Sequence, residues 1–136
     1  MKTDLIPDLN DLIGKPFHED GYGPDNYSCY GLAVEVFKRF GINIPKINIS
    51  VCACKKASQK AIEENLIKSW QPTKIITPPT GIVIKSTDPA FANHLGVYIG
   101  AGRFIHITIN RAVVVDRIAD WKYKIIGYYS YIDNNN

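Results

Sequence analysis

The sequence predicts an α+β fold, because one amphipathic helix is followed later in the chain by a β-hairpin. Apolar residues recur at helical spacing after residue 28, and apolar and polar residues alternate through residues 94–109. Cys29 stands at the start of the helix, and His94 and His106 stand on the hairpin. A helix N-terminal thiol facing a strand histidine, with a second polar ring to orient that histidine, is the arrangement of a cysteine hydrolase.

The predicted helix begins at Cys29 and ends before Gly41. Ser28 can cap it, because the serine hydroxyl can accept an unpaired amide hydrogen of the first turn. Gly41 is expected to end it in the left-handed conformation. The apolar stripe that identifies the helix consists of Leu32, Ala33, Val36, Phe37 and Phe40.

Cys29 shares the face of this stripe, so its thiol is expected to point toward the body of the domain. The free amides and the positive end of the helix dipole favour the thiolate, and they are expected to lower the pKa of Cys29. Gly31 costs about 1 kcal/mol relative to alanine inside a helix. One explanation is that another backbone or a substrate must approach closely there.

Strand register predicts that His94 and His106 lie on the same face of the hairpin. If the three residues between the strands form the turn, Val97 pairs with Ile105 and the aliphatic residues share the other face. His106 then lies opposite Gly96 and diagonal to His94, and the backbones of such diagonal neighbours are about 7–8 Å apart. Gly96 leaves the space between the two rings open. A two-residue turn would separate the histidines, so the hydrophobic pattern favours the longer turn.

Each of these side chains also has a structural interpretation. A buried cysteine is usually an inert small hydrophobe, and a strand histidine is usually part of the core. The joint pattern favours a functional site, because the helix start, the hairpin register and the residue types agree.

Four segments carry a resemblance to a known family, namely LIGKPF, GPDNYSCYGLAVEVFKRFGI, HLGVYIGAGRFIH and IIGYY. They resemble the NlpC/P60 cysteine peptidases, which hydrolyse peptidoglycan stem peptides. The aromatic residue after the cysteine and the C-terminal Gly-Tyr-Tyr look most like the phage-tail-associated branch of that family.

The resemblance implies a papain-like α+β core, with the nucleophile helix packed on an antiparallel β-sheet. It implies that Cys29 is the nucleophile, His94 its base and His106 the polar residue that orients the base. The implied substrate is a stem-peptide amide bond, typically between D-glutamate and a diamino acid. The chain departs from the family pattern at Ser28, where aspartate is usual, and at Phe17, where tyrosine is frequent.

Two other classes of function stay open. A related cysteine acyltransferase, deamidase or injected toxin would use the same three residues on a protein or a lipid. A catalytically weakened structural or wall-binding module would keep only the scaffold.

Composition is that of one globular domain over residues 1–136, with 46% hydrophobic and 21% charged residues. The net charge of +3 is mild and the lysines are scattered, which argues against a nucleic-acid partner. No apolar run approaches the roughly 20 residues that span a membrane.

The N-terminus has acidic residues and Pro7 where a signal peptide needs an apolar core. We therefore expect synthesis in the cytoplasm without a signal peptide. Delivery to the cell wall would then use a phage particle or another non-classical route, with phage-tail or secretion-system components as partners.

Three cysteines argue against a disulfide framework. Cys52 and Cys54 form a Cys-x-Cys pair, but a zinc site would need two further ligands, and His18 is the one spare histidine. We expect neither a metal nor a cofactor.

The remaining elements follow from local patterns. A short helix is expected near Leu9–Ile13 and a second helix over about Lys55–Ser69, followed by a proline-bounded connection over Trp70–Pro79. The expected strands are Ile82–Ser86, His94–Ile99, Phe104–Ile109, Ala112–Asp116 and Ile125–Tyr131.

Overall fold

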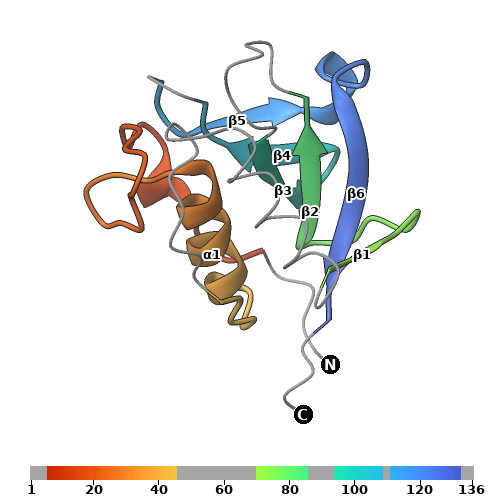
Figure 1. Ribbon diagram of the computed structural model, residues 1–136, viewed down its shortest axis with the longest axis horizontal. Helices are drawn as coiled ribbons and strands as arrows, with labels where there is room; N and C mark the ends of the chain where they lie inside the picture. The colour runs from red at the N-terminus through yellow and green to blue at the C-terminus, as the bar shows by residue number, and fades with distance from the viewer. Residues whose placement is uncertain (1–5, 46–69, 86–93, 109–110, 133–136) are drawn as a thin grey trace.

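The computed structural model describes residues 6–45, 70–85, 94–108 and 111–132 (Figure 1). Two short 3₁₀ helices, η1 (Asn10–Leu12) and η2 (Ile118–Asp120), and one α-helix, α1 (Cys29–Arg39), lie within these ranges. The strands within them are β1 (Trp70–Pro72), β2 (Thr80–Ile84), β3 (His94–Gly100), β4 (Arg103–His106), β5 (Val114–Arg117) and β6 (Ile125–Tyr131).

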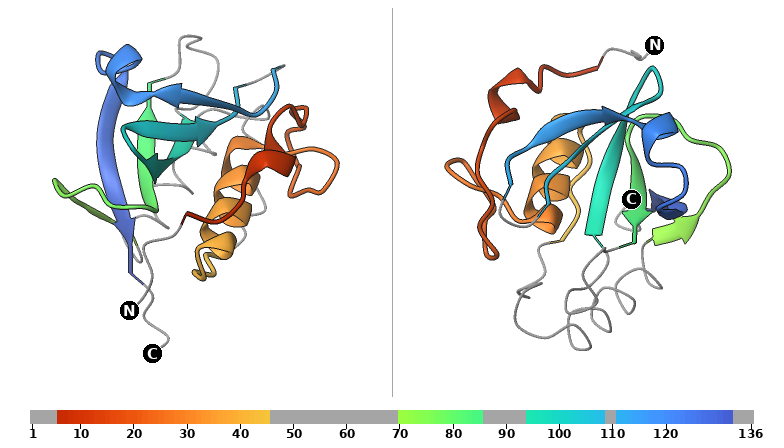
Figure 2. Two further views of the ribbon diagram at one scale, coloured as in Figure 1. Left: turned by 180° about the vertical axis from the view of Figure 1, so that it is seen from behind. Right: turned by 90° about the horizontal axis from the view of Figure 1, so that it is seen from above.

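The strands form one antiparallel sheet in the order β1-β6-β2-β3-β4-β5. Helix α1 packs against β3 and β4. Figures 1 and 2 show α1 as a separate layer on one side of the sheet. The predicted α+β class, with the cysteine-bearing helix packed on an antiparallel sheet, is therefore confirmed.

Both faces of the sheet carry buried side chains. The main core cluster joins α1 to the sheet and includes Phe37 and Ile105. A second cluster includes Ile84 and Phe104. Since Phe104 and Ile105 are neighbours on β4, the two clusters lie on opposite faces of that strand. His106 follows Ile105 and so points to the same side as Phe104.

Helix α1 begins and ends where the sequence predicts. The Ser28 hydroxyl accepts a hydrogen bond from the Gly31 amide at 2.9 Å, which is the expected N-cap. Lys38 and Arg39 occupy the last turn, and Gly41 follows with φ of 90°, in the left-handed region. The cap fixes the position of the first turn, which carries Cys29.

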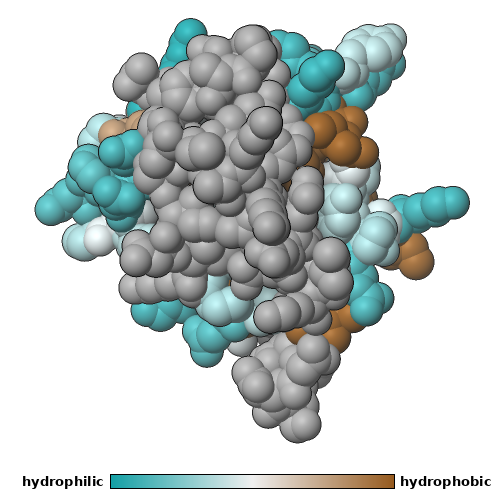
Figure 3. Space-filling view, in the orientation of Figure 1, coloured by the Kyte–Doolittle hydropathy of each residue, from teal (hydrophilic) through white to brown (hydrophobic). Residues whose placement is uncertain are grey.

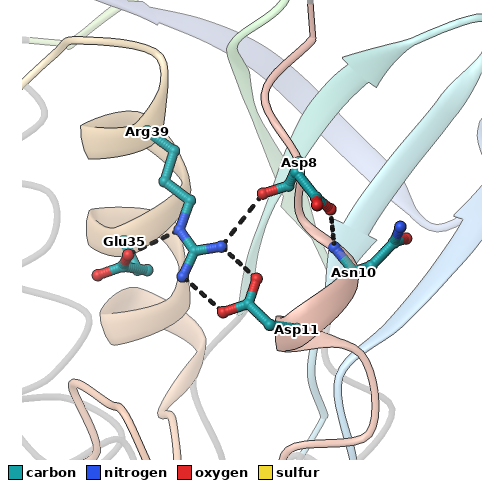
Figure 4. A network of polar contacts seen from close by, with 5 residues as sticks. All are labelled: Asp8, Asn10, Asp11, Glu35 and Arg39. Carbon is teal, nitrogen blue, oxygen red and sulfur yellow. Dashed lines mark hydrogen bonds and ion pairs between the residues drawn. The ribbon is translucent and has the colours of Figure 1, made fainter.

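Arg39 connects the end of α1 to the N-terminal segment (Figure 4). Its Nε donates to Glu35 at 2.8 Å, its Nη2 donates to Asp11 at 2.9 Å, and its Nη1 donates to the backbone carbonyl of Asp8 at 3.2 Å. The Asp8 carboxylate in turn accepts from the Asn10 amide at 2.9 Å. The hydrogen bond from Arg39 lowers the pKa of the Asp11 carboxyl. This network ties η1 to the last turn of α1.

The β3–β4 hairpin keeps the predicted side-chain faces by a different turn. Val97 pairs with Ile105 as predicted, but Gly100 pairs with Arg103, and the register shifts between Tyr98 and Gly100. The turn therefore has two central residues, both with positive φ, instead of the predicted three. The extra residue forms a bulge in β3. A bulge shifts the side-chain alternation by one residue, as the longer turn would. His94 and His106 therefore still lie on one face of the hairpin, as predicted.

The other strand predictions are confirmed with shifted ends, and β6 has the predicted bounds. The predicted connection over Trp70–Pro79 is wrong at its start, because Trp70–Pro72 forms β1 and pairs with β6. The expected helix near Leu9–Ile13 is a single 3₁₀ turn.

Some predictions lie outside the described residues. These are the helix over Lys55–Ser69, the Cys52 and Cys54 pair, and the last residues of two strands.

The described surface carries isolated apolar side chains. Among the coloured atoms of Figure 3, hydrophobic side chains form separate small patches on the β6 side of the molecule. Exposed large hydrophobic residues include Ile75, Ile126 and Ile132. Within the described ranges, no helix has the length and apolar character needed to cross a membrane.

Candidate active site

Cys29 occupies the first position of α1 and is only 4% exposed. Its thiol lies at the start of β3, because it interacts with the backbone of Leu95, the residue after His94. Backbone hydrogen bonds from Leu95, from Tyr30 and from Cys29 itself favour the thiolate. The first turn of α1 therefore places the thiol near the start of β3, the strand that carries His94.

Burial nevertheless raises the pKa of the Cys29 thiol above its usual value, and the backbone hydrogen bonds offset only part of this effect. The prediction that the helix start lowers this pKa is therefore wrong for the free protein. The helix dipole acts on a side chain that the sheet also removes from water, and desolvation of the thiolate is the larger effect.

Ser28 and Gly31 hold the first turn of α1 against the preceding loop. The Ser28 hydroxyl donates to the Gly21 carbonyl at 3.1 Å while it accepts from Gly31. A Cβ on Gly31 would overlap the same Gly21 carbonyl oxygen. The close approach expected at Gly31 is therefore made by a backbone, and it fixes the loop that precedes Cys29.

His94 and His106 lie side by side on one face of the hairpin, which confirms the predicted register. Their ring centroids are 5.7 Å apart and their planes differ by 8°. Gly96 lies against His106, since a Cβ there would come within 3.2 Å of the His106 Cβ and 2.9 Å of the Phe104 ring. The space beside Gly96 is thus filled by Phe104 and His106, and is not open as expected.

One nitrogen of each ring lacks a hydrogen-bond partner among the described residues. His94 Nε2 and His106 Nδ1 are both buried, and neither has a hydrogen-bond partner among the described residues. The predicted hydrogen bond from His106 to the far nitrogen of His94 is therefore not formed in this geometry. Buried polar atoms are almost always paired in native proteins, so two unpartnered nitrogens in adjacent rings are unusual.

Asp116 is the neighbour of His106 that sequence reasoning did not single out. Its Oδ2 lies 2.8 Å from His106 Nε2. On the β4–β5 ladder, Phe104 pairs with Asp116 and His106 pairs with Val114, so His106 and Asp116 are diagonal neighbours. The register argument that joined the two histidines would have found Asp116 if it had been extended to the next strand.

Trp121 closes the other side of the histidine pair. Its ring stands nearly perpendicular to both imidazoles, at centroid distances of 4.9 Å from His106 and 6.5 Å from His94. It also packs against Phe104. Trp121 follows η2 and was not recognised in the sequence, because it is not on a predicted strand.

This enclosure keeps both histidines neutral. Burial, with a smaller effect of His106, lowers the pKa of His94 to about 4. Burial also lowers the pKa of His106, although the hydrogen bond and charge of Asp116 act in the opposite direction. A neutral imidazole can accept a proton, which is the requirement for a general base.

Comparison with known proteins matches the chain to one family. The NlpC/P60 family model matches residues 14–128. The probable endopeptidase p60 of Listeria welshimeri is 27% identical over 126 residues, and the gamma-DL-glutamyl hydrolase of Bacillus subtilis is 26% identical over 127 residues. These alignments cover 91% and 90% of this chain but only 21% and 28% of the two relatives.

Solved structures show the same fold. An NLP/P60 family protein similar to lipoprotein from Staphylococcus aureus aligns with a TM-score of 0.61 and 20% identity, over 90% of this chain and 38% of that one. An NlpC/P60 family protein from Bacillus cereus aligns with a TM-score of 0.58 and 18% identity, over 95% and 42%. The papain-like α+β core expected from the sequence agrees with these structures.

Proposed function

Because this chain belongs to the NlpC/P60 family, we propose that it is a cysteine peptidase that hydrolyses an amide bond of peptidoglycan stem peptides. The observation that carries the proposal is that Cys29 starts α1 and that its thiol interacts with the backbone of Leu95, the residue after His94. The names of the relatives, an endopeptidase and a gamma-glutamyl hydrolase, support amide hydrolysis. The bond we propose joins D-glutamate to a diamino acid.

In this proposal Cys29 is the nucleophile and His94 its base. The sulfur attacks the amide carbonyl while His94 takes the thiol proton. The resulting tetrahedral intermediate expels the amine, which receives that proton from His94, and a thioester remains on Cys29. Water, deprotonated by His94, then hydrolyses the thioester, and His94 returns the proton to the thiol as the acid leaves.

The charge states of the free protein make general-base attack more favourable than a preformed ion pair. Burial raises the pKa of Cys29, and it lowers the pKa of His94 to about 4. Near neutral pH both side chains are therefore uncharged. The proton is transferred as the sulfur attacks, when the developing charge is on the substrate oxygen instead of the thiol.

The backbone amide of Cys29 is the first candidate donor to that oxygen. It lies in the first turn of α1, where amides have no partner within the helix. A donor at this place would stabilise the negative charge of the tetrahedral intermediate.

The test is incubation with purified peptidoglycan, with product masses determined by mass spectrometry. Wild-type protein is expected to release stem-peptide fragments cut at the D-glutamyl–diamino acid bond, and Cys29→Ser is expected to release none. Because cysteine and serine differ by one atom, the variant should keep the unfolding temperature of the wild type. Released sugar fragments, or equal cleavage by Cys29→Ser, would contradict the proposal.

Two other results would indicate the remaining functions. Labelling of Cys29 by an acyl donor without cleavage would favour an acyltransferase or deamidase. A Cys29 that reacts with neither substrate nor thiol reagent would favour a structural module, a reading that its burial and raised pKa support. Phage or other non-classical delivery to the wall stays part of the proposal and needs a localisation experiment.

A further inference from the structure

Asp116 has a contact that the proposed reaction does not use. Its carboxylate lies 2.8 Å from His106 Nε2, and the His106 side chain is only 2% exposed whereas that of Asp116 is 37% exposed. A carboxylate only accepts hydrogen bonds, so the hydrogen of a neutral His106 must be on Nε2. In this tautomer His106 Nδ1 carries no hydrogen and can only accept a hydrogen bond.

That acceptor is the buried atom of His106 that has no partner within the described part of the chain. The atom in need of a partner on the adjacent ring is His94 Nε2. These two atoms form no hydrogen bond in this structure, so the inference requires His94 Nε2, carrying its hydrogen, to approach His106 Nδ1. That contact would leave His94 Nδ1 as the nitrogen with the free lone pair. A base needs such a lone pair to accept a proton.

We propose that Asp116 is a positioning residue, which fixes the tautomer of His106 and, through His106, the tautomer of His94. This inference rests on the proposed function, in which His94 is the base. Asp116 touches neither substrate nor thiol in this scheme. Its effect passes along the diagonal neighbours of β5, β4 and β3, each of which contributes one side chain to the same side of the sheet.

A purely structural role for this pair would hold β5 against β4 without affecting the imidazoles. The β4–β5 ladder already joins these strands through four residue pairs. Because burial lowers the pKa of His106, the 2.8 Å contact with Asp116 is a hydrogen bond from a neutral ring and not an ion pair. The tautomer is therefore the property that distinguishes the two roles.

The sharpest variant is Asp116→Asn. It keeps the size of the side chain, but its amide group can donate to His106 Nε2, which permits the wrong tautomer. We expect kcat to fall about 10- to 100-fold, as when other groups that orient a histidine are removed, with little change in KM. Asp116→Glu keeps an acceptor-only group at a partly exposed position and is expected to recover most of kcat.

Nitrogen-15 NMR of the imidazoles gives a measurement that does not depend on catalysis. In the wild type, His106 is expected as the Nε2–H tautomer, and in Asp116→Asn both histidines are expected to change. Asp120→Asn is the matched control, because Asp120 pairs with Arg117 at 3.2 Å on the surface, and it should leave both spectrum and kcat unchanged.

A wild-type His106 in the Nδ1–H form, or tautomers and kcat unaffected by Asp116→Asn, would overturn the inference. If the wild type cleaves no peptidoglycan, the proposed function fails separately. The imidazole spectra of folded wild type and Asp116→Asn then still decide whether Asp116 sets the tautomers.

Discussion

At the scale of single residues, burial affects the pKa values of the proposed nucleophile and base more strongly than position on the helix does. Cys29 has the helix start that usually activates a thiol, yet its pKa is raised because the side chain is buried. His94 is neutral for the same reason. Both effects favour the uncharged forms of Cys29 and His94 over a thiolate–imidazolium pair before the substrate binds.

The first prediction ranks the two histidines. His94→Ala is expected to remove nearly all cleavage, because the thiol loses the group that accepts its proton and later protonates the amine. His106→Ala should keep a measurable fraction of kcat, because in the proposed mechanism His106 orients His94 and does not transfer the proton. His106→Gln should recover part of the loss, since an amide oxygen can accept the same imidazole hydrogen. Steady-state kinetics would contradict this order if His106→Ala were as inactive as His94→Ala.

The second prediction concerns the acid limb of the pH profile. A base must be unprotonated, and the pKa of His94 is lowered to about 4, so activity should be retained below pH 6 and fall only near pH 4. The profile of kcat/KM from pH 3.5 to 8 measures this. His106→Gln removes the smaller cause of the lowered pKa and should move the limb to higher pH. A wild-type limb near pH 6.5 would show that His94 is solvated like an ordinary histidine.

The residues of the site could be predicted to different extents. Cys29, His94 and His106 were found because spacing and alternation are local properties that the sequence displays. Asp116 is reached only through a second strand pairing, and the raised pKa of Cys29 depends on the sheet that covers it. Both are consequences of tertiary structure.

At the scale of elements, two backbone features place the site. The bulge in β3 keeps both histidines on one face, although the turn is shorter than the sequence predicts. The absence of a side chain at Gly31 lets the Gly21 carbonyl, in the loop before α1, pack closely against the first turn of the helix. One extra residue has the same effect on side-chain alternation whether it lies in the turn or in a strand bulge. The sequence therefore predicts which face each side chain of the hairpin occupies, but not the length of the turn.

The third prediction tests that backbone contact. Gly31→Ala in an open helix would stabilise the protein by about 1 kcal/mol. Here the added Cβ overlaps the Gly21 carbonyl, so we expect a loss of about 1–3 kcal/mol, typical of overpacking. Gly127→Ala is the control, because its Cβ would meet only the Tyr129 side chain at an ordinary 3.4 Å. Urea unfolding compares the two, and a stabilised Gly31→Ala would contradict the close approach.

At the scale of the whole molecule, the edge strand β1 could not be predicted from the sequence. Trp70–Pro72 is short and proline-bounded, and it becomes a strand only by pairing with β6, which lies far along the chain. Such pairing leaves no local alternation to detect. The long, alternating strands and the capped helix were predictable because each carries its own pattern.

The last prediction uses Trp70, which joins three parts of the fold. Its ring, 3% exposed, packs edge-to-face against Phe37 of α1 and Tyr131 of β6, with centroids 5.2 Å away in each case. Trp70→Ala should therefore lower the free energy of unfolding by about 3–5 kcal/mol, because it removes buried area from both layers at once. Tyr123→Ala, at a position 91% exposed, should change it by less than about 0.5 kcal/mol. If urea unfolding gave similar small losses for both variants, β1 would not be a cooperative part of the domain.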